Sequence, residues 1–477
     1  MSALASTALH DAGALTLQQV LAKHLLPFTM RPDQVETCNE LADWPRAGLY
    51  CEVGTGKTVM STVLALMWNA DVNIVTMPPI LLKQWKRWLE SIGNIGDVVI
   101  YRGTPKERAA IGLVGPKWIL MTIQILKQDF DRLKKELGPL SKTVTVDEAT
   151  CVKNPTSQNH KAVAEFSAGH NLALLTGTPL STPHDTYAYV KLISPGVYRS
   201  KTQFDNIHVA EKDFYENVVR WQNLDLMQTN LMMHSVRLLK ENVLKGLKSP
   251  NYIPIEYELA KEHKALYDQI AEEQLLLLGD GKIDMTNASK LYNVLQQIIV
   301  NWDFFCGDEN ARSTAFDLVD YVMDEAQVMR QDKSKLIIFT YYKMTSRKLL
   351  TYLQEFGVVG AYSEISSRQQ EINSERFKFD PACRILVAQP ISGGFGSDYQ
   401  HVCNEVLFLE SPRMPIHFNQ GVGRVYRDGQ PFAPNIHIGI ASGTIQRRLF
   451  DTMLKNDELL NQAQGSYIDL REAIYGK

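Results

Sequence analysis

The sequence predicts an α/β fold with two domains, each a mostly parallel sheet flanked by helices, and a helical region between them. Three observations lead to this prediction. The chain of 477 residues is longer than one hydrophobic core usually organises. Short apolar runs separated by helix-like segments recur in its first and last parts, as in doubly wound domains. The part between them has long amphipathic stretches and few strand signals.

The first domain is predicted from apolar runs that each end in small or charged residues. A helix-like segment or a loop follows each run, which is the alternation of a parallel sheet with its crossover helices. The predicted strands are residues 48–53, 72–77, 118–122, 143–146 and 172–176.

The remaining chain is predicted to be helical at first and then α/β again. Amphipathic spacing predicts helices at 262–278 and 288–301, and a packing helix at 444–464. Strands are predicted at 335–340, 384–388, 405–409 and 435–440. The expected parts are an N-terminal segment 1–24, a first domain 25–196, a helical region 197–312 and a second domain 313–477.

The composition is that of a globular protein without a bulk basic charge. Hydrophobic residues make up 45% of the chain and charged residues 22%, and the net charge is -3. This charge argues against a protein that holds nucleic acid by bulk electrostatics. It does not exclude nucleic-acid binding, because backbone N–H groups, hydroxyls and a few local lysines and arginines can hold phosphates.

Cysteine spacing and hydropathy exclude several other classes of protein. The six cysteines form no C-x-x-C pair, so we expect neither a zinc site nor a disulfide framework, and a reducing cytosol fits. His401 and Cys403 are expected to pack near a strand rather than to bind metal. No secretory signal and no apolar run of the ~20 residues that cross a bilayer are present, so we expect a cytoplasmic protein with no membrane partner.

The strongest motif is a glycine-rich loop at residues 51–58, after a predicted strand and before a predicted helix. This is the context of a phosphate-binding loop. Gly54 and Gly56 would turn backbone amides onto phosphates, and Lys57 would reach the terminal phosphates. Thr58 would offer a hydroxyl to Mg²⁺ at the helix N-terminus.

Two adjacent carboxylates, Asp147 and Glu148, end the predicted strand at 143–146. Successive positions at a strand end point in different directions, so two roles are available. Asp147 would hold Mg²⁺, directly or through water, and Glu148 would orient or activate an attacking water. Two acids at a strand end are often accidental, and the upstream loop is what makes this pair informative.

Arg424 and Arg427 lie three residues apart, which predicts that both lie on one face of a short helix. They are candidates for arginine fingers, whose guanidinium groups stabilise charge on a transferring phosphoryl group. Taken alone, such a pair is more often a solvated helix face.

Together these motifs resemble the Swi/Snf-like branch of the superfamily-two helicases and translocases, over residues 25–460. The blocks that carry the resemblance are residues 31–34, 52–58, 82–85, 147–148 with 152–154, 176–180, 192–196, 335–339, 392–396 and 420–430. The resemblance implies two RecA-like lobes, ATP and Mg²⁺ as cofactors, and a compact phage or bacterial member of the branch.

The resemblance also assigns roles to single residues. Gln34 would read adenine, Lys57, Asp147, Glu148, Arg424 and Arg427 would be catalytic, and Thr58 and Asp147 would hold the metal. The residues expected to bind the nucleotide are Gln34, Gly54, Thr55, Gly56, Lys57, Thr58, Gly396 and Gln420. Candidate nucleic-acid contacts are Pro78, Lys83, Thr122, Thr340 and residues 392–394.

The sequence departs from the pattern of this branch at several positions. Cys51 replaces a glycine of the strict phosphate-loop pattern, and Thr150 replaces the usual histidine of the acid motif. Residues 238–242 stand where a basic pair is common, and Arg237 is basic nearby. Phe395 and residues 397–399 replace smaller and amide-bearing residues.

The function expected from the resemblance is ATP hydrolysis that drives translocation along duplex DNA or its remodelling, with DNA favoured over RNA. One alternative is a helicase that separates strands of DNA or RNA in replication or repair. Another is a nucleic-acid-binding scaffold that has lost hydrolysis, for which Cys51 and Thr150 are the hints.

Overall fold

The computed structural model describes residues 13–279, 285–308, 311–328, 334–390 and 398–464, and of residues 274–279, 285–290 and 367 it describes the backbone alone. The chain divides into two compact units. Unit 1 is Met1–Lys245 with Leu459–Tyr467, and unit 2 is Gly246–Glu458 with Ile468–Lys477. The region 197–312 is therefore divided between the two units.

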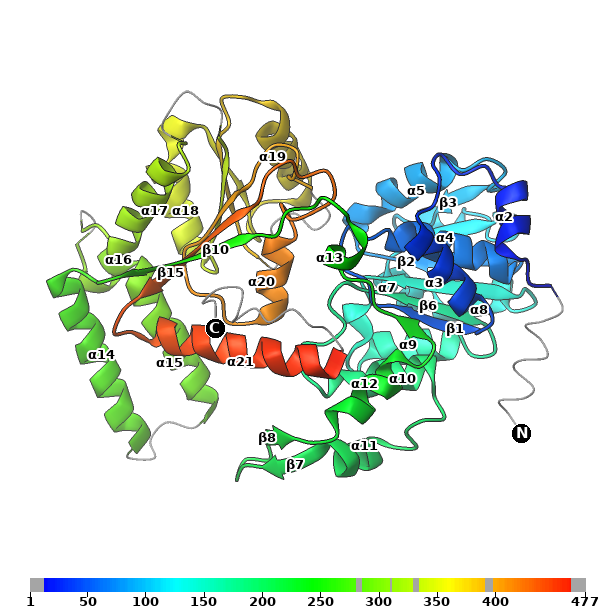
Figure 1. Ribbon diagram of the computed structural model, residues 1–477, viewed down its shortest axis with the longest axis horizontal. Coiled ribbons are helices and arrows are strands. Elements are labelled where there is room, and N and C mark those ends of the chain that lie inside the picture. Colours follow the sequence, from blue (N-terminus) through cyan, green and yellow to red (C-terminus); the bar gives the residue numbers. More distant parts are fainter. Residues whose placement is uncertain (1–12, 280–284, 309–310, 329–333, 391–397, 465–477) are drawn as a thin grey trace. The chain divides into compact units, whose positions relative to one another are not determined.

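Unit 1 is built on a sheet whose described strands are all paired in parallel, in the order β3-β4-β2-β5-β6-β1-β9 (Figure 1). The strands are β1 (Arg46–Leu49), β2 (Val72–Thr76), β3 (Val98–Ile100), β4 (Trp118–Met121), β5 (Lys142–Asp147), β6 (Asn171–Leu175) and β9 (Ser235–Val236). Each of the five strands predicted for this domain is present. β3 and β9 were not predicted.

Helices cover both faces of this sheet, because neighbouring strand residues point into opposite cores. Ile74 of β2 lies in one core and Val75 in the other. The first core contains residues of α7 (Ile123–Gln128), α8 (Phe130–Leu137), α9 (Gln158–Phe166), α10 (Asp185–Ile193), α11 (Lys201–His208) and α12 (Leu224–Met232). The second contains residues of α2 (Leu17–Lys23), α3 (Pro32–Ala42), α4 (Lys57–Trp68) and α5 (Leu82–Glu90).

Short elements complete unit 1. They are η1 (Pro79–Leu81), α6 (Pro105–Ala109), η2 (Ala149–Val152), α13 (Lys240–Val243) and an antiparallel hairpin of β7 (Val209–Lys212) and β8 (Val218–Trp221). The hairpin corrects the expectation that this part of the chain is helical. Its strands are four residues each and lie on the surface, so they carry too few alternating apolar positions to be read as strands.

Unit 2 is built on a second sheet with parallel pairs, in the order β10-β15-β14-β11-β13-β12. Its strands are β10 (Asn251–Tyr257), β11 (Leu336–Phe339), β12 (Val358–Ala361), β13 (Ile385–Ala388), β14 (Glu405–Phe408) and β15 (Asn435–Ala441). The four predicted strands are present. β10 corrects the helical expectation: it is an edge strand, where Pro254 is tolerated, and proline masks the strand signal.

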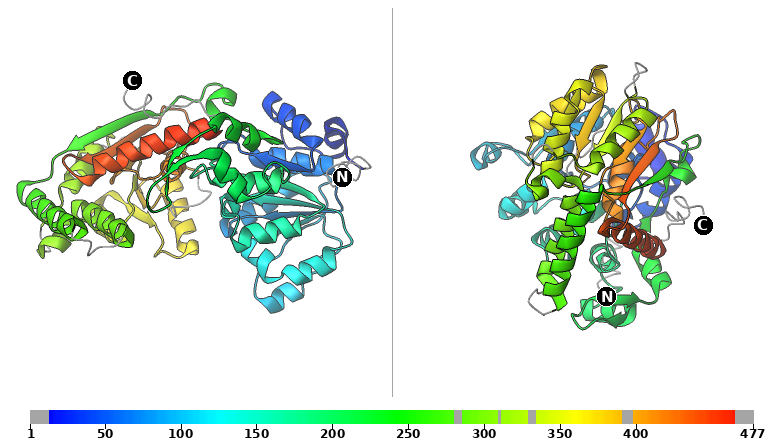
Figure 2. Two further views of the ribbon diagram at one scale, coloured as in Figure 1. Left: turned by 90° about the horizontal axis from the view of Figure 1, so that it is seen from below. Right: turned by 90° about the vertical axis from the view of Figure 1, so that its left-hand side faces the viewer.

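Helices also cover both faces of the second sheet (Figure 2). One core takes residues from α15 (Met285–Val300), α17 (Thr314–Glu325) and α18 (Lys343–Tyr352), and the other from α19 (Ser367–Phe379), α20 (Pro415–Val422) and α21 (Ile445–Gln464). The remaining elements are α14 (Lys261–Gly279), α16 (Trp302–Cys306) and η3 (Gln354–Phe356). The predicted fold class, two α/β lobes with mostly parallel sheets flanked by helices, is confirmed.

Among the helices that the structure describes, none has both the length and the apolar character needed to cross a bilayer.

The packing of α20 on its sheet generates a stability prediction. A Cβ atom on Gly421 would lie 2.7 Å from Cζ of Phe408 and 3.1 Å from Cε2 of Phe339. The Gly421→Ala substitution should therefore push α20 away from the sheet and lower the free energy of unfolding by about 1–3 kcal/mol. Thermal or denaturant unfolding measures this loss. Gly196→Ala is the control, because nothing lies within 4 Å of the added atom, and equal stability of the two variants would contradict the prediction.

Candidate active site

The glycine-rich loop connects β1 to α4 and so lies between a strand and a helix, as the sequence predicts. Gly54 and Gly56 have φ angles of 90° and 96°, in the left-handed region that favours glycine. Gly56 caps the N-terminus of α4. A Cβ atom there would lie 2.2 Å from Nε2 of Gln34, so another residue at this position would displace the Gln34 amide and would be strained by the positive φ angle.

Lys57 lies across the loop that precedes it. Its ammonium group donates hydrogen bonds to the carbonyl oxygens of Cys51, at 2.7 Å, and Glu52, at 3.1 Å. Thr55 is buried and its hydroxyl donates to the same Glu52 carbonyl at 2.8 Å. Thr58 is half-buried in the first turn of α4. The loop therefore holds its cation at the N-terminal end of a helix, where anions are favoured.

Gln34 is buried against the loop, although it lies on α3. Its amide nitrogen donates to the Thr55 carbonyl at 3.3 Å, and its amide oxygen accepts from the Arg31 backbone N–H at 3.0 Å. Arg31 donates to the same Thr55 carbonyl and forms a bidentate pair with Asp33. Gln34 thus joins the loop to the N-terminus of α3.

Asp147 ends β5 as a buried carboxylate. The indole N–H of Trp85 donates to its Oδ2 at 2.8 Å, and the Glu148 backbone N–H donates to its Oδ1 at 3.0 Å. Burial raises the pKa of Asp147 to about 6, and the negative charge of Glu148 adds to the rise, whereas Trp85 and Lys57 act against it. A nearby cation would therefore favour the ionised form.

Glu148 has a φ angle of 54°, in the left-handed region that a residue with a side chain rarely adopts. Such a conformation costs about 1–3 kcal/mol and is typical of functional sites. The strand therefore ends at Asp147, and the chain turns at Glu148. Next to this strand, the buried Thr176 follows β6. A Cβ atom on the following Gly177 would lie 3.4–3.6 Å from Val53 and Cys51 of the loop.

Residues 234–240, which include part of the block where the sequence departs from the family pattern, pack along one side of the glycine-rich loop. The backbone N–H groups of Tyr50 and Glu52 donate to the carbonyl oxygens of Val236 and Leu238, both at 2.9 Å. The Lys240 N–H in turn donates to the Glu52 carboxylate at 2.7 Å. We call residues 234–240 the strap. Its strand β9 has two residues, which is too short for a periodic signal.

Arg237 belongs to the strap and donates to the Tyr50 carbonyl at 3.1 Å. Cys51 is buried, and its thiol donates to the Val236 carbonyl. The residue that replaces the pattern's glycine thus packs between the loop and the strap. Thr150, the other departure, places its hydroxyl 3.5 Å from the Glu148 carbonyl.

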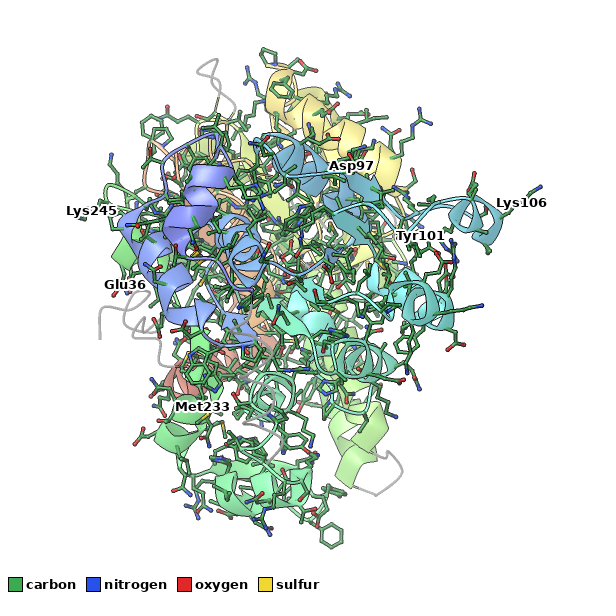
Figure 3. The ribbon with its side chains drawn as sticks, turned by 90° about the vertical axis from the view of Figure 1, so that its right-hand side faces the viewer. Glu36, Asp97, Tyr101, Lys106, Met233 and Lys245 are labelled. Atoms are coloured by element: carbon green, nitrogen blue, oxygen red, sulfur yellow. The ribbon has the colours of Figure 1, made fainter. Side chains whose placement is uncertain are left out.

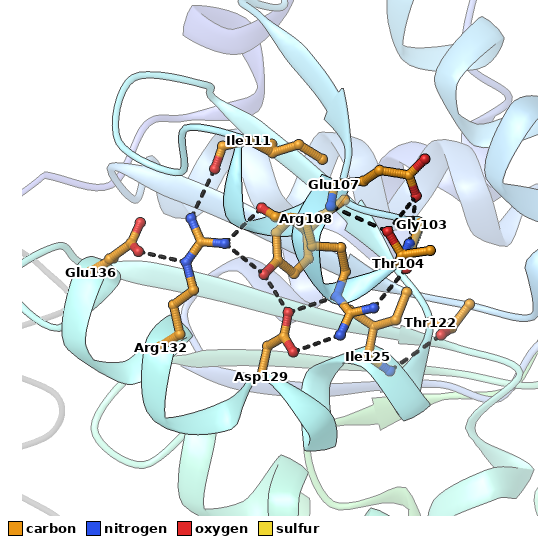
Figure 4. Close-up of polar contacts among 11 residues, drawn as sticks. Gly103, Thr104, Glu107, Arg108, Ile111, Thr122, Ile125, Asp129, Arg132 and Glu136 are labelled. Atoms are coloured by element: carbon orange, nitrogen blue, oxygen red, sulfur yellow. Dashed lines mark hydrogen bonds and ion pairs between the residues drawn. The ribbon is translucent and has the colours of Figure 1, made fainter.

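A half-buried ion-pair network, which was not predicted, lies at the end of β3 (Figure 4). Arg108 of α6 makes a bidentate pair with Asp129, with distances of 2.7 and 2.8 Å, and also donates to the Gly103 carbonyl. Tyr101 donates to the same carboxylate, and the Arg108 hydrogen bonds hold the pKa of Asp129 below its usual range. Arg132 extends the network to the Arg108 and Ile111 carbonyls.

This network fixes the loop between β3 and α6, at the edge where the carboxyl ends of the parallel strands meet. Exposed Arg102 and Lys106 lie on this part of the chain, and Figure 3 shows Lys106 pointing away from the sheet. The sequence carries no local signal for the network, because Asp129 lies 21 residues from Arg108 and 28 residues from Tyr101.

In unit 2 the two arginines do not lie on a helix, which corrects the sequence prediction. α20 ends at Val422, so Arg424 and Arg427 follow it in a turn. Arg424 is buried, and the Tyr399 N–H donates to its carbonyl at 3.0 Å. Arg427 donates from Nε to the Gly423 carbonyl at 2.6 Å and pairs with Asp398.

Of the other unit 2 residues that the sequence singled out for nucleotide or nucleic-acid binding, the structure describes Gln420 and Thr340. Gln420 is half-buried in the last turn of α20. Gly396, Phe395 and residues 392–394 lie outside the described residues. Thr340 is buried and donates to Glu410 at 2.7 Å.

Among the expected nucleic-acid contacts of unit 1, Lys83 is exposed on α5, and Pro78 precedes η1. The Thr122 hydroxyl accepts from the Ile125 N–H and so caps α7. Within the described residues, no group of three or more His, Cys, Asp or Glu side chains could hold a metal ion, around His401 and Cys403 or elsewhere.

Glu410 follows β14 and is fully buried. It accepts from the Thr340 hydroxyl and, at 3.1 Å, from the Tyr341 N–H. Burial raises the pKa of Glu410 to about 7, against the effect of these hydrogen bonds and of Arg413. A second carboxylate with a raised pKa therefore lies at the carboxyl edge of the second sheet.

Two family models match the chain. The model of the SNF2-related domain matches residues 40–303, and the model of the helicase conserved C-terminal domain matches residues 317–429. Together they cover the glycine loop, the two carboxylates and both arginines.

Among curated proteins, the chain is similar to the uncharacterized ATP-dependent helicase YqhH of Bacillus subtilis, with 22% identity over 94% of this chain and 82% of that protein. It is 25% identical to the human SWI/SNF-related matrix-associated actin-dependent regulator of chromatin subfamily A member 1, over 88% of this chain and 42% of that protein. It is 24% identical to the uncharacterized ATP-dependent helicase MG018 of Mycoplasma genitalium and spans 39% of its length.

Among solved structures, the SWI2/SNF2 ATPase core of Sulfolobus solfataricus in complex with dsDNA matches at 21% identity and a TM-score of 0.43. The match covers 96% of this chain and 99% of that one.

The buried Glu410 generates a pH-dependent prediction. Its folded-state pKa, about 7, lies above the ordinary 4.5, so the folded protein keeps a proton that the unfolded chain releases between these values. Stability is therefore lost as the pH rises through this window, by up to about 3 kcal/mol. Glu410→Gln removes the charge, while its amide can still accept from Tyr341 and donate to Thr340.

Denaturant unfolding at pH 5 and pH 8 tests this expectation. Glu410→Gln should be more stable than the unsubstituted protein at pH 8 and close to it at pH 5. The control is Glu355→Gln, which removes an exposed carboxylate of the same unit. A Glu410→Gln effect that does not change with pH would show that Glu410 is ionised throughout.

Proposed function

We propose that this chain, which belongs to the SNF2-related family of helicase-type ATPases, couples ATP hydrolysis to translocation along duplex DNA. The family model covers more than half of the chain, and the resemblance expected from the sequence is confirmed. The chain is thus an ATP hydrolase of the helicase type that acts on nucleic acid. The assignment of single residues and the choice of duplex DNA and translocation are proposals.

The observation that carries the site assignment is the arrangement at the carboxyl edge of the first sheet. β5 pairs with β6, and β6 pairs with β1, so Asp147 and the phosphate loop follow strands of one continuous parallel sheet. Lys57 is close enough to Asp147 to lower its pKa. In parallel sheets, ligands bind at this edge. We therefore assign Gly54 to Thr58 to the phosphates of ATP.

The oxygen donors at this edge fit a magnesium ion. Mg²⁺ prefers carboxylate, hydroxyl and water oxygens, and the Thr58 hydroxyl and the Asp147 carboxylate are donors of this kind. We assign both to the metal. Bound there with the phosphates, the ion would neutralise negative charge on them.

The remaining residues take the roles that the sequence suggests. Glu148, set apart from Asp147 by its left-handed backbone, orients or activates the attacking water. Arg424 and Arg427 supply positive charge to the transferring phosphoryl group. Gln34, which contacts the loop through Thr55, binds the adenine base, and Gln420 and Gly396 belong to the same nucleotide site.

Duplex DNA is favoured over RNA by the likeness to relatives, of which one is named as a chromatin regulator and two as ATP-dependent helicases. The chain spans 82% of YqhH but about 40% of MG018 and of the human relative. Activities that need the rest of those longer proteins lie outside the proposal. A bacterial or phage cytoplasm remains the proposed setting.

Phosphate release in the presence of different nucleic acids tests the proposed function. We expect duplex DNA to stimulate ATP hydrolysis more than single-stranded DNA or RNA, and Lys57→Ala to abolish the stimulated rate because the phosphates lose their cation. Lys86→Ala, which removes a half-buried lysine that pairs with Glu90, should retain the rate.

Displacement of a third strand from a triplex separates translocation from strand separation. Translocation predicts ATP-dependent triplex displacement without release of a forked strand. The opposite pattern would favour a strand-separating helicase. If nucleic acid stimulated no more phosphate release in the unsubstituted protein than in Lys57→Ala, the nucleic-acid-binding scaffold without hydrolysis would be the supported function.

The Trp85–Asp147 hydrogen bond predicts a change in the pH dependence of hydrolysis. Trp85→Phe removes the donor that favours ionised Asp147, so the pKa of Asp147 should rise further. The acid limb of the rate profile should then move up by roughly one pH unit. Trp88→Phe is the matched control, because Trp88 of the same helix donates to Thr62 instead. A shift in both variants, or in neither, would disprove the link.

A further inference from the structure

The β7–β8 hairpin emerges from unit 1 between α11 and α12 and is firmly held at its base (Figure 1). The Trp221 ring packs edge-on against His184, with 4.7 Å between the ring centroids. The Gln222 N–H donates to the His208 carbonyl at 2.9 Å, and the Asn223 amide donates to the Ile207 carbonyl at 2.7 Å. His208 is itself fully buried, so the base of the hairpin is part of the packed unit.

The tip of the hairpin is an ordered turn rather than a loose loop. The Asp213 carboxylate accepts from the backbone N–H groups of Tyr215 and Asn217, both at 2.9 Å, and from the Asn217 amide at 3.0 Å. The Asp213 N–H also donates to the Asn217 carbonyl at 2.9 Å. These bonds fix the turn without using the side chain of Phe214 or Tyr215.

The turn presents two aromatic rings to solvent. Phe214 is 93% exposed and Tyr215 is 60% exposed. The rings meet edge-to-face, with centroids 5.4 Å apart. Neither ring contributes to the core, so the fold does not need them. Rigid aromatic side chains displayed in this way are typical of contact residues, because little conformational entropy is lost on binding.

The size of the tip indicates what it contacts. Two aromatic side chains can bury about 150–250 Å² each. A stable protein–protein interface buries about 800 Å² on each partner, which is more than this tip offers. A single nucleic-acid base is a flat ring that one aromatic side chain can cover, and stacking between them is a strong contact. The tip therefore fits a base better than a protein surface.

The charge of the hairpin indicates which part of a nucleic acid it meets. Residues 209–221 contain three acidic and two basic residues, so their net charge is negative. Both basic residues also form ion pairs within the hairpin, Lys212 with Glu216 and Arg220 with Glu211. This surface does not attract phosphates. In a continuous duplex neighbouring pairs cover both faces of each base, so an uncovered base occurs at an end, a gap or a fork.

We propose that Phe214 and Tyr215 stack on an uncovered base of the nucleic acid and give this ATPase a preference for interrupted over continuous duplex. The proposal rests on the proposed function in that it assumes a nucleic-acid substrate. It adds a structure-selective contact that the ATP site and the phosphate contacts do not provide.

Competition binding with the full chain tests this preference. A labelled forked duplex is displaced by unlabelled fork or by covalently closed circular duplex of the same sequence, and the ratio of the two affinities is measured. The double variant Phe214→Ala/Tyr215→Ala should lower this ratio by roughly five- to a hundredfold. Val219→Ala, an exposed residue on the same hairpin, is the matched control and should keep the ratio.

A direct readout of stacking comes from 2-aminopurine placed at the fork. The protein should quench its fluorescence, the double variant should not, and Phe214→Trp should retain the quenching. The salt dependence of fork binding should have the same slope in the double variant, because the tip contacts no phosphates.

The proposal is overturned if the double variant keeps the ratio and the quenching, or if it loses affinity for closed circles and forks equally. A fork preference that depends on the two rings, in a protein without stimulated phosphate release, would support the hairpin contact and reject the proposed motor. Stimulated phosphate release in a protein whose fork preference does not depend on the two rings would reject the hairpin contact and keep the proposed motor.

Discussion

The backbone course of residues 50–56 constrains the rest of unit 1. Gly56 must adopt a left-handed conformation and leaves no space beside the Gln34 amide. Gly177 approaches the loop from the neighbouring strand end, and the strap bonds to it from the other side. Three distant parts of the chain therefore converge on one loop, and each contacts its backbone. Glycine suits position 56 because the positive φ angle strains other residues and a Cβ atom there would displace the Gln34 amide, whereas a Cβ atom on Gly177 would make only ordinary contacts.

Each unit also carries a buried carboxylate just after or at the end of a central strand, Asp147 in the first and Glu410 in the second. Burial raises the pKa of both, so their ionised forms cost folding energy. Asp147 offsets part of this cost through Trp85 and the Glu148 N–H, and the proposed metal would offset more. Glu410 is held by Thr340 and Tyr341. The ionised Asp147 carboxylate thus lowers the stability of the fold, and a bound cation would recover part of that loss.

The sequence predicted the central strands because they are buried on both faces and hence mostly apolar: β4 is apolar throughout, and β2 is apolar apart from the buried Asn73 and Thr76. It predicted the loop and the acid pair because their spacing carries the chemistry. It did not predict β9, which has two residues, or β10, an edge strand with a proline. The arginine pair was wrongly placed on a helix, since α20 ends at Val422. The Arg108–Asp129 network was missed because its members are far apart in the sequence.

The strap has a consequence for how the protein is made. Glu52 and Lys240 bond to each other although 188 residues separate them. A chain growing on the ribosome exposes the glycine loop early, but the carbonyl groups that order Tyr50 and Glu52 emerge only when the strap does. Until then the nascent loop lacks one wall, so the proposed nucleotide site gains its full set of loop contacts only after most of the first lobe has been synthesised.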